Sequence, residues 1–271
     1  MSLDQLQGHF GFSRLPFGRQ IPAERLCPSR AHREAAARIA FVIAQGSIGL
    51  ICGEVGSGKT TALRAATEPL DRSRHTVCYL PNPAVGERGI YQALICTLGG
   101  RVRFHKSELI NRAYELLERE AQERAKQVTL AIDEAHLLSP QQLEELRMLT
   151  NSQMDSCSSL ALIMLGQPQL RRYLRMGSFA ALDQRIALRY ELSGMDAQES
   201  LAYVRHHLQF AGRSDALFSD DALDAIHQTA RGIPRQINNL ALQALIAAYA
   251  QGKEIVDYAC AQAAIAEVAA E

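Results

Sequence analysis

The amino-acid sequence predicts an α/β fold with a parallel sheet and covering helices, followed by a small all-helical domain. Two observations carry this prediction. Short apolar runs of strand length recur through the first 192 residues, each beyond an amphipathic helical segment, which is typical of strands buried in a parallel sheet. From residue 193 onward, helical segments follow one another without a strand-like run. With 271 residues, 47% of them hydrophobic, the chain can bury one large core or two modest ones.

The chain begins with a segment that differs from both domains. Residues 1–28 contain three of the eight phenylalanines and three of the nine prolines of the chain, so we expect an irregular N-terminal arm. We expect this arm to pack onto a core through Phe10, Phe12 and Phe17. Residues 29–46 are the first predicted helix of the α/β domain.

Five apolar runs are the predicted strands, and turns or charged stretches bound them. They are IGLIC, TVCYL, VTLAI, LALIMLG and, as a weaker fifth, RIALRYEL, at 48–52, 76–80, 128–132, 160–166 and 185–192. Four helical segments follow at 197–212, 219–232, 234–252 and 257–270. The predicted division is therefore an arm at 1–28, an α/β domain at 29–192 and a helical domain at 193–271.

Composition narrows the class of protein. The chain has 29 Lys and Arg residues and 29 Asp and Glu residues, so its net charge gives no indication of nucleic-acid binding. A local basic patch is still compatible with a neutral chain. Six cysteines lack metal-ligand spacing and are expected to be reduced thiols. The sequence has no apolar signal core at its start and no run near the roughly 20 apolar residues that span a membrane. We therefore expect a cytoplasmic protein with no membrane partner.

A glycine-rich segment, GEVGSGKT at 53–60, lies directly after a predicted strand and before a helix. Such glycines let backbone N–H groups turn toward phosphates, Lys59 would reach the β and γ phosphates, and Thr60 would offer its hydroxyl to Mg²⁺. A glycine turn that matches by chance is the alternative, which the strand and helix context disfavours. We therefore expect ATP and Mg²⁺ to bind here, through Gly53, Glu54, Val55, Gly56, Ser57, Gly58, Lys59, Thr60 and Thr61.

A second motif, VTLAIDEAH, is an apolar strand that ends in two carboxylates. Asp133 would hold the metal through water, together with Thr60, and Glu134 would polarise the attacking water. Two neighbouring carboxylates at the end of a buried strand repel each other, which costs free energy unless a cation binds beside them. By itself the motif is also compatible with a strand that runs into an acidic helix cap, but together the two motifs predict one phosphate site.

The same two motifs resemble motifs I and II of the RNA helicases named for the tetrapeptide DEAH. Those helicases need two tandem nucleotide-binding domains, a Ser-Ala-Thr motif after the next strand and an arginine-rich motif. Here the next strand ends in Gly166 and Gln167, and a helical region follows. The sequence therefore disfavours a helicase.

Motifs along most of the chain resemble the AAA+ class of P-loop ATPases, and within it the ExeA-like and transposition-helper ATPases of the TnsC, TniB and Mu B types. The segments that carry the resemblance are FGF..LPF, GEVGSGKTT, IDEAHLLSPQQLEELRMLTN, LIMLGQPQLRRYL, LDQRIALRYEL, YVRHHLQFAG and RGIPRQINNLALQAL. The resemblance implies that 29–192 is an AAA+ nucleotide-binding domain and 193–271 its helical lid. It also implies rings or filaments in which one subunit completes its neighbour's site.

The resemblance assigns roles to three further residues. Gln167 matches sensor 1, which orients water against the γ phosphate; a turn residue is the alternative. Arg235 in GIPRQIN matches the sensor 2 arginine, and a surface arginine at a helix start is its alternative. Arg185 best matches the arginine finger that reaches a neighbour's ATP, with a salt-bridged surface arginine as the alternative.

Two functions are compatible with this family. In the first, the protein is a transposition helper that oligomerises on double-stranded DNA in its ATP form and recruits or regulates a transposase. In the second, it is the ATPase part of an ExeA-like secretion assembly factor with a protein client, which would be expected to continue into a membrane span and a peptidoglycan-binding module. Because the sequence ends after the predicted lid, the first function is the expectation.

Two basic clusters could contact DNA. One is RVRFHK at 101–106, and the other comprises Arg171, Arg172 and Arg175. Contacts from such clusters would be to phosphates and without sequence specificity. A solvated charged face is the alternative for each.

Overall fold

The computed structural model describes residues 2–18, 27, 29–151 and 160–269. Contacts within the chain divide it into two compact units. The α/β unit consists of Glu34–Val55 and Lys59–Leu192, and the helical unit consists of Met1–Arg33, Gly56–Gly58 and Ser193–Glu271.

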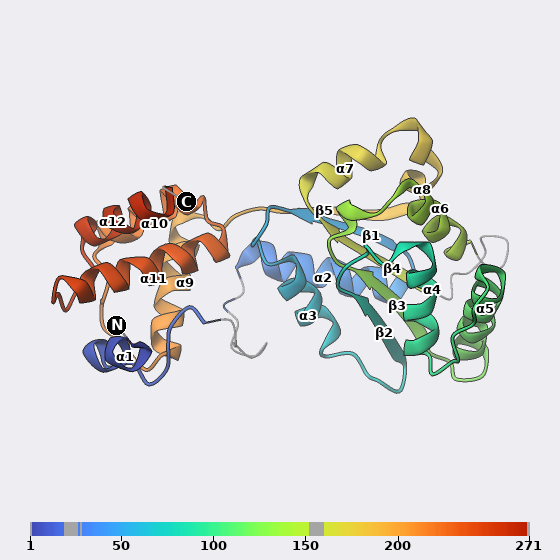
Figure 1. Ribbon diagram of the computed structural model, residues 1–271, viewed down its shortest axis with the longest axis horizontal. Helices are drawn as coiled ribbons and strands as arrows, with labels where there is room; N and C mark the ends of the chain where they lie inside the picture. The colour runs from blue at the N-terminus through green and yellow to red at the C-terminus, as the bar shows by residue number, and fades with distance from the viewer. Residues whose placement is uncertain (1, 19–26, 28, 152–159, 270–271) are drawn as a thin grey trace. The chain divides into compact units, whose positions relative to one another are not determined.

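The α/β unit is built on a five-stranded sheet in the order β2-β3-β4-β1-β5, and every pair of neighbouring strands is parallel (Figure 1). The strands are β1 (Ile48–Gly53), β2 (His75–Leu80), β3 (Gln127–Ile132), β4 (Leu160–Gly166) and β5 (Ile186–Leu192). The central strands β1 and β4 are buried at every residue, as expected for strands covered on both faces. The predicted α/β fold with a parallel sheet is therefore confirmed.

Helices cover both faces of this sheet. They are α2 (Arg30–Gln45), α3 (Lys59–Thr67), α4 (Gly86–Thr97), α5 (Lys106–Gln122), α6 (Pro140–Leu149), α7 (Pro168–Leu174) and α8 (Ala180–Arg185), with short 3-10 helices η2 (Ala135–Leu137) and η4 (Gly177–Phe179). Apolar residues of α4, α5 and α6 form one core with Leu50, Leu130 and Leu162. Gly49, whose neighbour Leu50 faces that core, lies against Val42 of α2 on the other face.

The helical unit contains α9 (Ala197–Phe210), α10 (Asp220–Ala230), α11 (Pro234–Ala250) and α12 (Tyr258–Ala269), which share a second apolar core. The N-terminal helix α1 (Leu3–Phe10) belongs to the same unit. None of the described helices has the length and apolar character that crossing a membrane would require.

The expectation that residues 1–28 form an irregular arm is wrong for its first part. Residues of α1 are helical because Ser2 and Gln5 form a capping box and Leu6 and Phe10, four positions apart, bury one face. Phe12 and Phe17 are buried in the core of the helical unit together with them. Residues 19–26 and 28 of the predicted arm lie outside the described residues, and the division at 1–28, 29–192 and 193–271 stays a proposal.

Candidate functional site

The glycine-rich segment forms the loop between β1, which ends at Gly53, and α3, which begins at Lys59. Gly56 and Gly58 have φ angles of +82° and +95°, in the region that glycine enters without a Cβ clash. The loop therefore leads into the N-terminus of a helix, where unpaired backbone N–H groups and the helix dipole favour an anion. The oxygen Oγ of Ser57 is buried and has no hydrogen-bond partner in the part of the chain that the structure describes.

Lys59 is buried at the first position of α3, with 7% of its surface exposed. Its Nζ donates to the carbonyl oxygens of Gly53 at 2.8 Å and Glu54 at 3.0 Å. Burial lowers the pKa of Lys59, while the carboxylates of Glu134 and Asp133 act in the opposite direction. A cation held at a helix N-terminus with only partial charge compensation fits a phosphate group.

Asp133 follows β3 and is 5% exposed. Its Oδ2 accepts a hydrogen bond of 2.6 Å from Thr60 Oγ1, and its Oδ1 accepts one of 2.9 Å from the backbone of Glu134. A hydroxyl and a carboxylate side by side are the hard oxygen donors that Mg²⁺ prefers. Among the described residues no group of three Cys, His, Asp or Glu side chains could hold a metal.

Tyr79 is a member of this site that the sequence analysis missed. It lies near the end of β2, whose partner in the sheet is β3, and its hydroxyl donates to Asp133 Oδ2 at 2.9 Å. Burial raises the pKa of Tyr79, and the hydrogen bond to Asp133 raises it further, so the phenol stays a donor. Because 54 positions separate Tyr79 from Asp133, no local motif links the two residues. The sequence signal for Tyr79 was limited to a polar aromatic residue near the end of a predicted strand.

Tyr79→Phe is expected to weaken Mg²⁺ binding by about 10-fold, because an outer partner that orients a metal ligand typically contributes that much. The change keeps the ring and removes only the donor to Asp133. The measurement is a Mg²⁺ titration of nucleotide binding. Tyr114→Phe is the matched control, because the Tyr114 hydroxyl donates instead to the carbonyl of Met148. Equal Mg²⁺ midpoints for wild type and Tyr79→Phe would remove Tyr79 from the site.

Glu134 adopts a left-handed conformation, with φ 50° and ψ 35°, immediately before η2. Such a conformation is uncommon for a residue other than glycine and often occurs at functional sites. Its carboxylate Oε2 lies 3.4 Å from Nδ1 of His136, and Nε2 of His136 lies 3.0 Å from Nε2 of Gln167. The structure therefore places Gln167, the residue after β4, close to the DEAH turn. His136 was not among the residues predicted from the sequence, although it stands two positions after Glu134.

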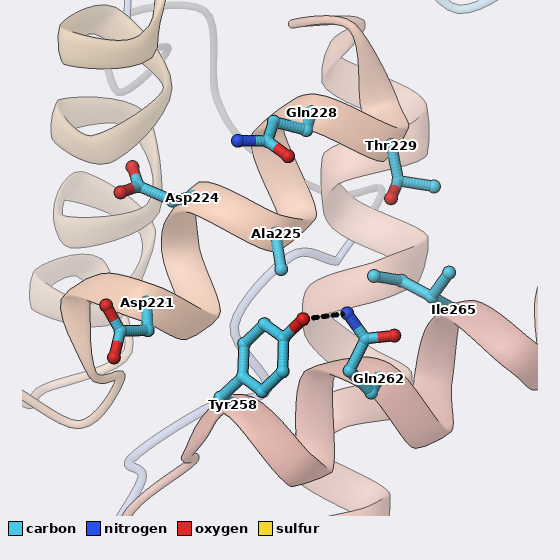
Figure 2. A pocket seen from close by; sticks show the side chains of 8 residues that line it. All are labelled: Asp221, Asp224, Ala225, Gln228, Thr229, Tyr258, Gln262 and Ile265. Atoms are coloured by element: carbon cyan, nitrogen blue, oxygen red, sulfur yellow. Dashed lines mark hydrogen bonds between the residues drawn. The ribbon is translucent and has the colours of Figure 1, made fainter.

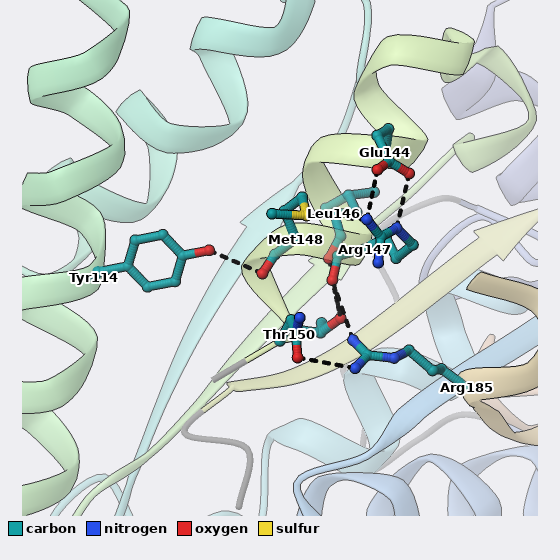
Figure 3. A network of polar contacts seen from close by, with 8 residues as sticks. Tyr114, Glu144, Leu146, Arg147, Met148, Thr150 and Arg185 are labelled. Carbon is teal, nitrogen blue, oxygen red and sulfur yellow. Dashed lines mark hydrogen bonds and ion pairs between the residues drawn. The ribbon is translucent and has the colours of Figure 1, made fainter. Parts of the chain in front are cut away.

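Arg185 ends α8 and is bonded within the chain (Figure 3). Its guanidinium donates to the carbonyl of Arg147 at 3.3 Å and to Oδ1 of Asn151 at 3.0 Å, at the C-terminal end of α6. The first bond reaches a carbonyl in the last turn of α6, which also accepts from Thr150, and the second reaches the side-chain amide of Asn151. The role of arginine finger stays a proposal for this residue. Arg235, the second residue of α11, is exposed in the helical unit, and its sensor role likewise stays a proposal.

The two basic clusters differ in how far their charges are paired. Arg101 and Arg103 are exposed, and Phe104 is 77% exposed. Lys106, in contrast, forms ion pairs with Glu87 and Glu145. In the second cluster Arg171 pairs with Glu191, at 3.2 Å, and Arg172 and Arg175 are exposed.

The helical unit contains a separate cavity of about 440 Å³ (Figure 2). Asp221 and Asp224 of α10 line it opposite Tyr258 and Gln262 of α12, whose side chains are joined by a hydrogen bond of 2.8 Å. None of the predicted site residues lines this cavity.

Comparisons with known proteins agree with this geometry. A family model described as an AAA domain matches residues 43–174, which include the loop and the DEAH turn. The chain is 34% identical to General secretion pathway protein A of Aeromonas hydrophila over 247 residues; the match covers 90% of this chain and 45% of that relative. The chain therefore spans about half the length of the curated relative it matches.

Solved structures share the fold. The ORC2 protein of Aeropyrum pernix in ADPNP-ADP complexes has a TM-score of 0.68 at 15% identity, covering 93% of this chain and 70% of that chain. The Aeropyrum pernix ORC1 protein in complex with DNA has a TM-score of 0.64 at 18% identity, covering 87% and 65%. Drosophila ORC bound to DNA has a TM-score of 0.64 at 19% identity, covering 98% and 66%. The fold of this chain is thus the P-loop fold of the AAA+ class, and its residues 43–174 are similar to the AAA domain.

Proposed function

We propose that the protein hydrolyses ATP with Mg²⁺ at the loop 53–60, and that its nucleotide state controls its assembly on double-stranded DNA as a transposition helper in the cytoplasm. The observation that carries the ATPase proposal is the hydrogen bond of 2.6 Å between Thr60 and Asp133. It joins the two motifs, which lie 73 positions apart, at one edge of the sheet. Lys59 directly precedes Thr60 in the sequence, and Glu134 directly follows Asp133.

The residues of the site have complementary roles in this reaction. Lys59 would donate to phosphate oxygens in place of the loop carbonyls that it contacts now. Thr60 and Asp133 would hold Mg²⁺, which when bound would neutralise charge on the phosphate oxygens. Glu134 would accept a proton from the attacking water, whose oxygen forms the new bond to the γ phosphorus. The bond between the γ phosphorus and the β–γ bridging oxygen would break at the same time, and ADP would leave with its electron pair. Gln167 would orient this water.

Two arginines complete the proposed site. Arg235 would contact the γ phosphate as sensor 2, and Arg185 would reach the ATP of a neighbouring subunit in a ring or filament. ATP binding would then favour the assembled state, and hydrolysis would time its release.

Double-stranded DNA is the proposed surface for this assembly, with a transposase as the protein partner. Arg101 and Arg103 are exposed beside the exposed ring of Phe104, an arrangement suited to phosphate contacts. Each patch is small, but an oligomer repeats it in every subunit and multiplies its effect. Two proteins that share the fold, Aeropyrum pernix ORC1 and Drosophila ORC, have structures with DNA, which supports the proposal at the level of the fold.

A role in secretion is the second candidate. The 34% identity with General secretion pathway protein A, over 90% of this chain, favours it. The same ATPase site would then act on a protein client instead of DNA. The two candidates differ in whether the protein binds double-stranded DNA, which can be measured with the purified protein.

Binding to a labelled random-sequence duplex tests the DNA proposal, measured with a non-hydrolysable ATP analogue, with ADP and without nucleotide. We expect large complexes with the analogue only, and an affinity that falls steeply as salt rises. Arg101→Ala combined with Arg103→Ala should weaken binding and reduce the salt dependence, whereas Arg205→Ala, at an exposed position of α9, is the matched control. Intact ATP turnover without DNA binding in any nucleotide state would favour the secretion candidate.

A further inference from the structure

His136 occupies the space between the two side chains proposed to handle the attacking water. It lies in η2, and its side chain is only 6% exposed. One ring nitrogen, Nε2, is 3.0 Å from the amide nitrogen of Gln167, and the other, Nδ1, is 3.4 Å from the carboxylate of Glu134. The imidazole thus spans from the residue after β4 to the turn after β3.

The position of His136 is set by close packing of the backbone. A Cβ atom at Gly166, the last residue of β4, would lie 3.2 Å from the backbone nitrogen of His136 and 2.7 Å from Leu170 Cδ2. A side chain at this position would therefore require the Leu170 side chain to move and the backbone of η2 to shift by a few tenths of an ångström, whereas glycine allows the close approach of β4 and η2. A ring held by such packing can transmit a small movement of one neighbour to the other.

The contacts of the ring define its tautomer. An amide nitrogen only donates, so Nε2 of His136 accepts from Gln167. A neutral imidazole that accepts at Nε2 carries its proton on Nδ1. Within residues 2–18, 27, 29–151 and 160–269, Nδ1 is buried and has no hydrogen-bond partner. A buried N–H group without an acceptor costs free energy, and the Nδ1–H of His136 is such a group. The half-exposed carboxylate of Glu134 would remove this cost by moving toward Nδ1.

We propose that His136 is a positioning residue that couples the orientation of the Gln167 amide to the position of the Glu134 carboxylate. When the Gln167 nitrogen faces the ring, the Nδ1 proton faces Glu134 and attracts it. When Gln167 turns its amide nitrogen away, Nε2 loses its hydrogen-bond donor and the Nδ1–H tautomer is no longer favoured. The attraction between Nδ1–H and the Glu134 carboxylate is then lost, and Glu134 is free to move. The inference rests on the proposed ATPase function and adds a link between its sensor and its base.

The first test observes the ring directly, in the full chain without nucleotide. Long-range ¹H–¹⁵N correlation spectra of histidine-labelled protein distinguish the two tautomers, and His136→Gln identifies the signal among the eight histidines. We expect the Nδ1–H tautomer in wild type. Gln167→Glu offers only acceptors to Nε2, so it should move the proton to that nitrogen. An Nε2–H tautomer in wild type, or the same spectrum in both proteins, would overturn the coupling.

The second test separates positioning from packing. His136→Leu fills a similar volume without polar atoms and should lower kcat about 10–100-fold, as loss of an outer-shell partner does, with little change in the KM for ATP. His136→Gln restores a donor and an acceptor and should recover most of kcat. Equal kcat in His136→Leu and wild type would overturn the inference.

The two tests also separate this inference from the proposed function. A wild-type protein without ATP turnover would refute the ATPase proposal, whereas the tautomer measurement would still decide the coupling. Circular dichroism shows whether each variant is folded. If His136→Leu does not fold, a double-mutant cycle of His136→Phe, which keeps an aromatic ring without nitrogen atoms, with Gln167→Glu replaces it, and additive effects on kcat would contradict a direct link.

Discussion

Lys59→Ala is expected to abolish ATP binding. The ammonium of Lys59 is buried at the N-terminus of α3, and within the described part of the chain it donates to two loop carbonyls, which phosphate oxygens could replace. Two charge-assisted hydrogen bonds of about 1.5–3 kcal/mol each correspond to a loss of roughly 100-fold or more in affinity. Calorimetric titration with ATP and Mg²⁺ measures this loss.

A matched lysine controls for a general effect of charge. Lys126 belongs to the same unit and donates to the carbonyl of Arg72, outside the loop, so Lys126→Ala should bind ATP normally. The melting temperature of Lys59→Ala should show that it remains folded. Unchanged ATP affinity in folded Lys59→Ala would refute the assignment of residues 53–60 as the phosphate-binding loop.

Glu134→Gln is expected to bind ATP but to lose about 10²–10⁴-fold in the rate of hydrolysis, the usual contribution of a general base. The change keeps the shape of the side chain and leaves the backbone hydrogen bond from Glu134 to Asp133 in place. Glutamine also suits the left-handed conformation as well as glutamate does, so the turn should be preserved. Single-turnover phosphate release, together with ATP affinity, separates chemistry from binding.

A second glutamate provides the control for this variant. Glu144 of α6 forms an ion pair of 2.7 Å with Arg147, away from Asp133, and Glu144→Gln should keep wild-type turnover. If the DNA proposal is correct, Glu134→Gln should also remain assembled on DNA after ATP is added. Wild-type rates of phosphate release from Glu134→Gln would exclude Glu134 as the base.

The glycine-rich loop and the DEAH turn were predictable because each is a contiguous segment. Phosphate binding needs successive backbone N–H groups followed by a lysine, and the short peptide from Gly53 to Thr60 supplies both. A carboxylate pair at the end of an apolar strand is equally local. The helix at Leu3–Phe10 was also open to prediction from its Ser2 and Gln5 capping box, but the aromatic residues and prolines that follow obscured it.

The amino-acid sequence by itself determined the strands, the helical C-terminal region and the residues that we propose for phosphate and metal binding. Only the tertiary structure decided the strand order β2-β3-β4-β1-β5, which places Tyr79 beside Asp133 and Gln167 beside His136. These pairs lie 54 and 31 positions apart. The physical reason is that hydrophobic periodicity specifies which face of a strand is buried, whereas the neighbour of each strand depends on the packing of the whole sheet.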